Sequence, residues 1–451
     1  MTASTEPCPA TTTPLFFQRR FWPMWTSLSL GTFADNVLRQ SLLIGIPAGV
    51  IAVPYFTNPD NAIPYIGALL PIAILIFSSV SGQLADKYET SVMFRRTKFA
   101  EIVLMSVAAI AFISGQGALA IAMLFAMGAQ SAFFSPVRVS AMPKYLKPEE
   151  LVRGNGLCNA GLFTFILMGY VVGGFLIIQD YGGVAVGAVL VSAALGGWLA
   201  SLRTPFAAAN DPALKISFNG FAQTVAMFRY VFTSRGVAPP VLGVGVFYLL
   251  STAVTVTVPL YGRDALHADP LVWTALNGLF AIGAGIGAIG AASLAKGRSG
   301  LGFSTAAIGA AGLMSFAVYG LTPLVAGSPD APLSLGALFS TGPGLALVFV
   351  FIGTSAFSGV YIAPLQAAVQ RRAPAQFRAR IMAASVFANA AFAIPGSLSV
   401  LAITQTGMDP RLAFIAVGTA MLTIAGIMLT RRRLLPEGHY DEAFRGALAS
   451  H

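Results

Sequence analysis

The sequence predicts an all-α membrane protein of about twelve transmembrane helices, arranged as two six-helix pseudo-repeats. The 451 residues are 56% hydrophobic and only 10% charged, whereas an average soluble domain carries about 25% charged residues. Apolar runs long enough to cross about 30 Å of hydrocarbon recur along the chain, and segments of the first half recur in the second. Because one soluble core cannot hide so much apolar surface, a bilayer must solvate most of the chain.

Runs of suitable length occur throughout the chain, although Gly and Pro residues interrupt several of them. The expected spans are 25–53, 62–84, 98–115, 118–137, 154–178, 183–202, 238–261, 272–295, 302–322, 342–366, 380–404 and 411–430. The expected domains are a tail over 1–21, a six-helix bundle over 22–203, a linker over 204–236, a second six-helix bundle over 237–433 and a tail over 434–451. The first tail is polar and lacks the apolar segment of a cleaved signal peptide.

Lysine and arginine residues indicate the orientation, because cytoplasmic loops carry an excess of both. With the N-terminus inside, the cytoplasmic segments of the first half carry Arg19, Arg20, Lys87, Arg95, Arg96, Lys98, Arg138, Lys144, Lys147 and Arg153. The outer loops carry only Arg263 and Arg411. The net charge of +10 therefore follows the topology, so both termini are expected in the cytoplasm and no nucleic-acid partner is expected.

The linker contains a segment, 214–231 (LKISFNGFAQTVAMFRYV), that mixes apolar and polar residues at helical spacing. This pattern predicts an amphipathic helix lying at the cytoplasmic interface. A simple tether between the two bundles is the alternative.

Two pairs of segments are alike at a nearly constant offset. FFSP at 133–136 resembles YIAP at 361–364, and NAGLF at 159–163 resembles NAAF at 389–392. Both pairs flank a basic loop between the fourth and fifth spans of a half. A parallel six-plus-six repeat places the substrate site between the halves near the midplane, with access alternating as one half rocks against the other.

The segment GQLADK at 82–87, followed by Arg95 and Arg96, is the clearest local motif. Gly82 permits close approach of helices where the second span ends. Asp86, beside Lys87, can pair with basic groups or a helix N-terminus in one conformation and release them in the other. These residues are candidates for a conformational latch, and a plain basic anchor loop is the alternative.

Asp35, Asn36 and Arg39 lie inside the first span. Charges at that depth are costly and usually face a cavity or a partner. Asp35 and Arg39 are four residues apart, so they share a helix face and can neutralise one another. We therefore expect either a polar patch that binds a zwitterionic head group or carries a coupling proton on Asp35, or a structural pair within the helix.

Other charges lie near the ends of spans. Glu101 could pair with Lys98 or with Arg138, and a structural role is the stronger expectation. Arg138 follows a Ser-Pro pair at the end of the fourth span, where it could meet a phosphate or a loop carboxylate. A second-half cytoplasmic gate is expected from Arg378, Arg380 and Asn389. Interfacial anchoring is the alternative for the two arginines that open the eleventh span.

The sequence offers little support for enzymatic chemistry. The match to G-x-G-x-x-G at 285–290 lies inside an apolar run, where small residues favour close helix packing rather than dinucleotide binding. The three histidines form no H-E-x-x-H motif, and no P-loop is present. The two cysteines imply neither a disulfide framework nor a metal cluster. We expect no enzyme activity, no cofactor, and transport that is passive or driven by an ion gradient.

Together, FADN at 33–36, the block at 82–87 and the run FFSPVRVSAMPKYLKPEELVRGNGLCNAG at 133–161 resemble the lysophospholipid transporter family of the major facilitator superfamily. The likeness is closest to the transporter half of proteins fused to 2-acylglycerophosphoethanolamine acyltransferase. In the second half, YIAPLQAAVQ at 361–370 and RARI at 378–381 strengthen it. Within the superfamily, the motif at 82–87 acts as a conformational latch.

The resemblance implies a major facilitator fold and flipping of lysophospholipids, chiefly lysophosphatidylethanolamine, across a bacterial inner membrane. It matches Asp35 and Asn36 to a polar pair and Arg138 to a basic position. The chain departs from the family in two places. Arg39 stands where an apolar residue is expected, and the seventh span, in which the standalone family has an arginine, contains none over 251–260. No H-x-x-x-x-D motif follows His439, so any acyltransferase would be a separate partner, and a monomer is expected.

Two other functions remain open. A proton-coupled exporter of small amphipathic molecules would titrate Asp35 and depend on the proton gradient. A non-transporting membrane receptor or assembly factor would show no loss of flux when Asp35 is replaced by alanine.

Overall fold

The computed structural model describes residues 15–146, 150–209, 212–213, 236–295, 301–372 and 378–430. Over these ranges the chain is helical, with short loops between the helices and no strand beyond two isolated bridges. The amphipathic helix expected over 214–231 lies outside the described residues.

Twelve long helices are present in the described chain, as the sequence predicts. The first six are α1 (Trp22–Gly45), α2 (Ala62–Lys87), α3 (Thr90–Ile113), α4 (Gly117–Tyr145), α5 (Leu151–Ile177) and α6 (Gly182–Ser201). The second six are α8 (Ala238–Leu260), α9 (Pro270–Ala295), α10 (Leu301–Val325), α12 (Gly342–Arg372), α13 (Arg378–Leu398) and α15 (Leu412–Thr430). Shorter helices are η1 (Leu15–Phe17), η2 (Pro59–Asn61), the π-helix η4 (Tyr261–Ala265), α11 (Leu335–Ser340) and α14 (Leu401–Thr406).

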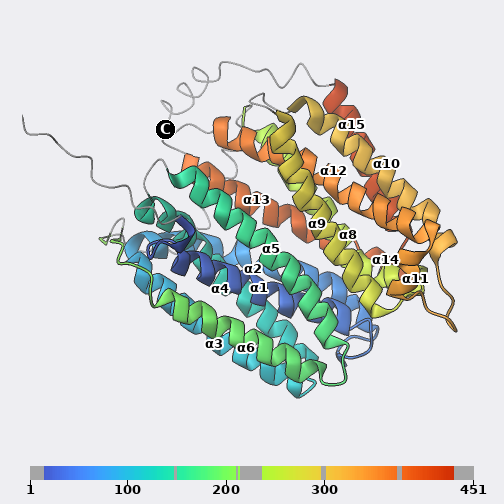
Figure 1. Cartoon of the computed structure of the whole chain (residues 1–451), viewed down its shortest axis with the longest axis horizontal. Helices are drawn as coiled ribbons and strands as arrows, with labels where there is room; N and C mark the ends of the chain where they lie inside the picture. The colour runs from blue at the N-terminus through green and yellow to red at the C-terminus, as the bar shows by residue number, and fades with distance from the viewer. Residues whose placement is uncertain are drawn as a thin grey trace, which may run out of the picture.

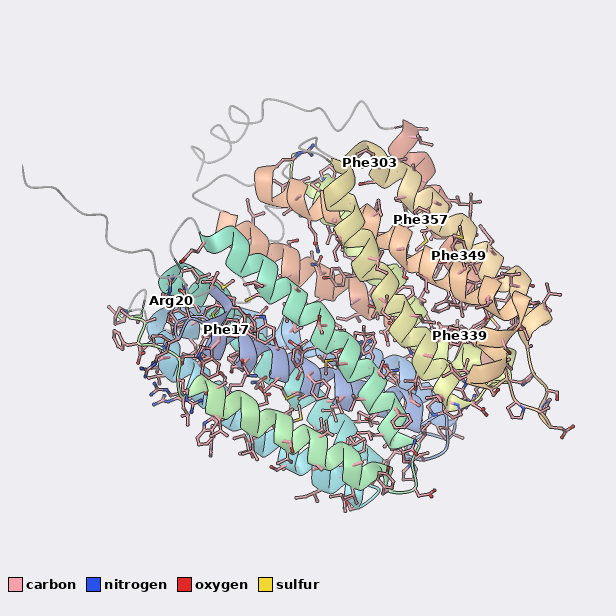
Figure 2. The ribbon with its side chains drawn as sticks, in the orientation of Figure 1. Phe17, Arg20, Phe303, Phe339, Phe349 and Phe357 are labelled. Carbon is pink, nitrogen blue, oxygen red and sulfur yellow. The ribbon has the colours of Figure 1, made fainter. Side chains whose placement is uncertain are left out.

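Ten helical segments of the described chain are long and apolar enough to cross a membrane. The two long helices that fall below this limit are α1 and α3, which carry the charged residues placed inside spans by the sequence. The outer surface is apolar, with Phe349 68% and Ile289 75% exposed. In Figure 2, Phe303, Phe357, Phe349 and Phe339 follow the length of the second half. The chain is therefore a multi-pass membrane protein, solvated by lipid along its sides.

The two halves repeat the same packing. Helix α1 packs on α5 as α8 packs on α13, α2 packs on α4 as α9 packs on α12, and α3 packs on α6 as α10 packs on α15. The repeated segments lie at equivalent positions, since FFSP is in α4 and YIAP in α12, while NAGLF is in α5 and NAAF in α13. The predicted six-plus-six repeat is confirmed.

The halves meet through α2 against α13 and α5 against α9. In Figure 1, α5 and α9 converge towards the lower right and diverge towards the upper left. A side chain at Gly67 would collide with Ser397, and one at Gly174 would collide with Thr274, so these glycines allow the closest approach. Both contacts lie towards the end of the bundle where α1 and α5 finish and α2 and α9 begin. We call this the clamped end and the opposite end the basic end.

Polar contacts between the halves are also found at the clamped end. Asn58 Nδ2 donates to the Thr404 carbonyl at 3.2 Å, and Ser397 Oγ donates to the Pro64 carbonyl at 2.6 Å. Arg263 joins Asp60 across the same boundary. The hydrogen bonds and ion pairs that Asn58, Asp60 and Ser397 make with the other half therefore lie at one end of the molecule. Polar contacts thus join the two halves at the clamped end.

The G-x-G-x-x-G match falls inside α9, as expected for a packing motif. The small residues allow close packing on one side of α9 only. On that side, a side chain at Gly283 would collide with Ser355 of α12, and one at Gly287 would collide with Ala356. Gly285 and Gly290 have nothing within 4 Å of where a side chain would begin. The motif therefore serves close approach of α9 and α12.

Replacing Gly287 with leucine is expected to lower the free energy of unfolding by about 1–3 kcal/mol or more, because the backbone of α12 has no room to yield. Thermal unfolding in detergent measures the effect. Gly285→Leu is the matched control on the open side of the same helix. Equal melting temperatures for the two variants would contradict this account of the motif.

Candidate functional site

A stripe of polar side chains runs along one face of α1. Thr32, Asp35, Asn36 and Arg39 are spaced three or four residues apart, which places them on one side of a helix. All four are partly exposed. The flanking apolar residues of the helix, Ala34, Val37 and Leu38, are fully buried. The face is therefore partly exposed, whereas the flanking residues of the helix are packed.

Other helices of the first half cover the remaining sides of α1. Helix α5 packs closely at Gly173, whose carbonyl accepts a hydrogen bond from Ser41 Oγ at 3.1 Å. Helix α3 approaches at Gly31, against the side chains of Lys98 and Glu101. Arg39, at one end of the stripe, reaches Tyr170 of α5. Tyr170 shares a face of α5 with Leu167, Val171 and Gly174, which lie against α9, so this end of the stripe lies beside the boundary with the second half.

The two charges of this stripe do not pair with one another. Ser131 Oγ of α4 donates to Asp35 Oδ2 at 2.9 Å, and Asp35 Oδ1 is buried with no partner. Arg39 Nη1 instead donates to Tyr170 Oη of α5 at 3.3 Å. Of the two alternatives that the sequence leaves open, the structural pair of Asp35 with Arg39 is not formed, because hydroxyls from different neighbouring helices hold the two side chains. Sequence spacing showed that they share a face but could not reveal these partners.

Asn36, the third predicted member of the patch, is partly occupied by its own helix. Its Nδ2 donates to the Thr32 carbonyl one turn earlier at 2.7 Å. Its Cβ packs where a side chain at Gly169 of α5 would otherwise sit. The amide therefore has an acceptor oxygen and one N–H left for another partner.

A dry ion pair lies behind the stripe. Lys98 Nζ contacts Glu101 Oε2 at 2.7 Å, and both side chains are 1% exposed. Gln130 Nε2 donates to the same carboxylate oxygen at 3.1 Å, and the ammonium lies 4.6 Å from the centre of the Phe134 ring. Glu101 thus pairs with Lys98, one of its two predicted partners.

The placement of Lys98 corrects one sequence prediction. The distribution of basic residues places Lys98 in a cytoplasmic segment, but it lies in the packed interior of the first half. The carboxylate one turn further along α3 neutralises it there, which a count of basic residues does not detect. Gln130 and Ser131 are adjacent on α4, so one turn of that helix contacts both the dry ion pair and Asp35. The charges of Lys98 and Glu101 also interact electrostatically with the Asp35 carboxylate.

The predicted latch residues lie at the basic end. Asp86 and Lys87 finish α2, while Arg95 and Arg96 are exposed on the first turns of α3. Gly82 is in the last turns of α2, as the motif requires. The latch function of these residues stays a prediction.

Lys144, at the end of α4, is a partner of this region that the sequence motif did not include. Its Nζ donates to Thr90 Oγ1 at 2.9 Å and to the Ala208 carbonyl at 2.7 Å. Burial lowers the pKa of Lys144, while the charge of Asp86 acts in the opposite direction. Lys144 therefore joins α4, the start of α3 and the segment after α6.

Three predicted cations cannot be placed in the site. The side chains of Arg138, Arg378 and Arg380 lie outside the described residues, although their backbones belong to α4 and α13. Asn389, the other member of the predicted second-half gate, has a buried Oδ1 with no partner. Its role also stays a prediction.

A family model described as Major Facilitator Superfamily matches residues 28–397. The chain belongs to this superfamily. Among curated proteins, it is similar to the lysophospholipid transporter LplT of Pectobacterium carotovorum, with 25% identity over 301 residues that cover 65% of this chain and 68% of that protein. The LplT of Citrobacter koseri is 27% identical over 59% of this chain and 63% of its own length, and that of Serratia proteamaculans is 30% identical over 37% and 42%.

Solved structures of other transporters share the fold. A peptide transporter POT in complex with alafosfalin aligns with a TM-score of 0.66 at 16% identity, covering 92% of this chain and 96% of that one. The nucleoside transporter NupG aligns with a TM-score of 0.61 at 13% identity, covering 90% and 99%. A bacterial homologue of the iron transporter ferroportin in the outward-facing state gives a TM-score of 0.55 at 12% identity, covering 90% and 98%.

Membership of the major facilitator superfamily gives the stripe on α1 a place in a carrier. Two six-helix halves of such a carrier enclose the substrate near the midplane. The stripe lies about midway along α1, and its Arg39 end lies beside the boundary with the other half. Asp35, Asn36 and Arg39 stand out in the sequence because charged and amide side chains are rare in spans, whereas Ser131 and Tyr170 do not, because hydroxyls there are common.

Proposed function

We propose that this chain is an alternating-access carrier that moves lysophospholipids, with head groups like that of lysophosphatidylethanolamine, across a bacterial inner membrane. The observation that carries the proposal is the pair of unpaired opposite charges, Asp35 and Arg39, on the polar face of α1. A zwitterionic head group offers one group for each charge. The lysophospholipid transporters among its relatives support the same substrate class.

The apolar surroundings suit the rest of such a substrate. The acyl chain of a lysophospholipid needs no polar partner and is stabilised by removal from water, at about 0.8 kcal/mol per CH₂ group. A carrier therefore needs polar side chains only for the head group. We assign the basic end to the cytoplasm, because lysine and arginine residues cluster there. The clamped end is then external, with both termini inside, and the molecule works as a monomer without enzymatic activity of its own.

One observation favours a second candidate. Asp35 Oδ1 is buried without a partner, as a carboxylate that takes up a proton would be. In a proton-coupled exporter of amphipathic molecules, flux would collapse when an uncoupler removes the proton gradient. Facilitated flipping of a lysophospholipid would continue under the same conditions.

A flip assay in proteoliposomes with labelled lysophosphatidylethanolamine tests the proposal. Asp35→Asn is expected to lower the initial rate about tenfold or more, since a hydrogen bond to a charged group contributes roughly 1.5–3 kcal/mol. Asp180→Asn, at an exposed position after α5, is the matched control and should leave the rate unchanged. If the wild type gave no flux above empty vesicles, the lysophospholipid would not be the substrate. If Asp35→Asn kept the full rate, Asp35 would not be part of the substrate site.

A further inference from the structure

Four charged side chains lie within the described helices of the first half, away from the helix ends. They are Asp35 and Arg39 on α1 and Lys98 and Glu101 on α3. The α3 charges contact each other and are shielded from solvent, with Glu101 Oε1 buried and unpartnered. The α1 charges sum to zero but are held apart, each by a neutral hydroxyl.

The environment of Arg39 is incomplete for a charge at this depth. A guanidinium carries five N–H donors and stays charged in proteins. In the described chain it donates one hydrogen bond, at the long distance of 3.3 Å, to Tyr170 Oη, and it makes no ion pair. Because the side chain is partly exposed beside the boundary between the halves, its remaining donors point to a ligand rather than to packed protein.

Tyr170 is arranged to bind the same ligand. Its hydroxyl oxygen accepts from Arg39, so its own proton remains free to donate. The residue is only 9% exposed, so its ring is fixed by packing in α5. A guanidinium fork and one hydroxyl donor together match an anion with two terminal oxygens, as in a phosphodiester.

Asp35 is one helical turn from Arg39 towards the basic end, about 6 Å along the axis. This spacing is of the order of the separation between phosphate and ammonium in an ethanolamine head group. An anionic head group, such as that of a glycerol phosphodiester, carries no ammonium. Its polar end would therefore meet the Asp35 carboxylate without a cation to neutralise it. The two charges would therefore select zwitterionic substrates.

We infer that Arg39 and Tyr170 bind the phosphodiester of the substrate, with Asp35 receiving its ammonium group, so that the carrier prefers zwitterionic to anionic lysophospholipids; this inference rests on the proposed function. Tyr170 is a substrate-binding residue that no sequence motif marks. Arg39 is then the cation that binds the substrate phosphate inside the membrane-spanning part of the carrier.

The test measures uptake of labelled lysophosphatidylethanolamine into proteoliposomes, in competition with lysophosphatidylglycerol and with monoacylglycerol, which lacks phosphate. Arg39→Gln is expected to raise the KM for lysophosphatidylethanolamine about tenfold or more and Tyr170→Phe about threefold, because each removes donors to a charged group. Competition by monoacylglycerol should be unchanged in both variants. Asp35→Asn should bring the two lysophospholipids to equal affinity.

Tyr170→Phe removes one oxygen and keeps the ring, so the inference stays testable if Arg39→Gln fails to fold. Arg203→Gln, an exposed cation near the end of α6, is the matched control and should leave KM unchanged. Wild-type uptake with an unaltered KM in Arg39→Gln or Tyr170→Phe would overturn the inference and leave the proposed function standing. No wild-type uptake of either lysophospholipid would overturn the proposed function itself.

Discussion

Arg263→Ala is expected to shift the carrier towards conformations that are open at the clamped end. Arg263 Nη1 and Nη2 donate to the two carboxylate oxygens of Asp60 at 2.9 and 2.6 Å, a bidentate geometry. Its Nη1 also lies 3.4 Å from the Pro47 carbonyl, so one side chain of the second half holds both ends of the loop between α1 and α2. Opening at this end must break these contacts.

The residue is positioned for this role by an irregular helix end. Arg263 lies in η4, a π-helical turn that continues α8, and π-helical turns are frequent at functional sites. Asp264 Oδ1 accepts from its Nε at 2.6 Å, which fixes the guanidinium in the plane that meets Asp60. The sequence identified Arg263 only as one of two basic residues in outer loops.

The expected shift is moderate because the pair is partly exposed. The side chains are 33% and 17% exposed, so we allow about 1–2 kcal/mol after solvent screening, or a population change of about five- to thirtyfold. Spin labels at Tyr55 and Met408, exposed positions of the two halves near this end, report the change as a longer distance distribution. The two native cysteines are replaced by serine for the measurement.

Arg411→Ala is the matched control for this experiment. Arg411 pairs with Asp409, also near the clamped end, but both residues belong to the second half. Its removal should leave the distance distribution unchanged. If Arg263→Ala and Arg411→Ala gave the same distribution as the wild type, the Arg263–Asp60 pair would not clamp the halves.

Most of the fold could be predicted because the length of an apolar run is a local property. The first expected span, 25–53, is the main error, since α1 ends at Gly45. The apolar residues that follow form a loop that packs back, with Ile51 against Gly45. Hydropathy alone cannot distinguish a partly buried apolar loop from the continuation of a helix. The break follows from Pro47 and from Gly49, whose φ of 75° favours glycine.

The candidate site could be predicted only in part. Charged residues inside an apolar run are visible in the sequence alone, so Asp35 and Arg39 could be predicted as site residues. Their partners Ser131 and Tyr170 are 96 and 131 residues away along the chain, and only the packing of α4 and α5 against α1 brings them together. The spacing rule that allows an ion pair within α1 describes an isolated helix surface. In a bundle, neighbouring helices compete for the same side chains.

Glu101→Ala is expected to destabilise the first half strongly, by about 3–5 kcal/mol, because it leaves a buried ammonium without a counter-charge. The Lys98 side chain is 1% exposed and packs against Gly31 of α1, so it has no route to water. Phe134 offers its ring at 4.6 Å, but a neutral ring cannot replace a carboxylate. Lower folded yield on size-exclusion chromatography and a lower melting temperature in detergent measure the loss.

The double variant Lys98→Met/Glu101→Leu separates the cost of breaking the pair from the contribution of the pair itself. Replacing a buried ion pair by apolar residues of similar size is often neutral or stabilising, and Gln130 keeps the Thr97 carbonyl as an acceptor at 3.1 Å. The melting temperature should therefore recover. Glu150→Ala, which breaks the partly exposed pair with Arg20, is the control and should cost no more than about 1 kcal/mol.

Transport by the recovered double variant then decides whether the dry pair does more than hold α3 against α1. Lys98 and Glu101 do not reach the accessible face of α1, but the same turn of α4 holds both Glu101, through Gln130, and Asp35, through Ser131. If the pair is structural, a folded double variant transports at the wild-type rate. A folded double variant without flux would show that the charge behind Asp35 is part of the transport cycle, and the division between a structural pair and a substrate-binding stripe would be wrong.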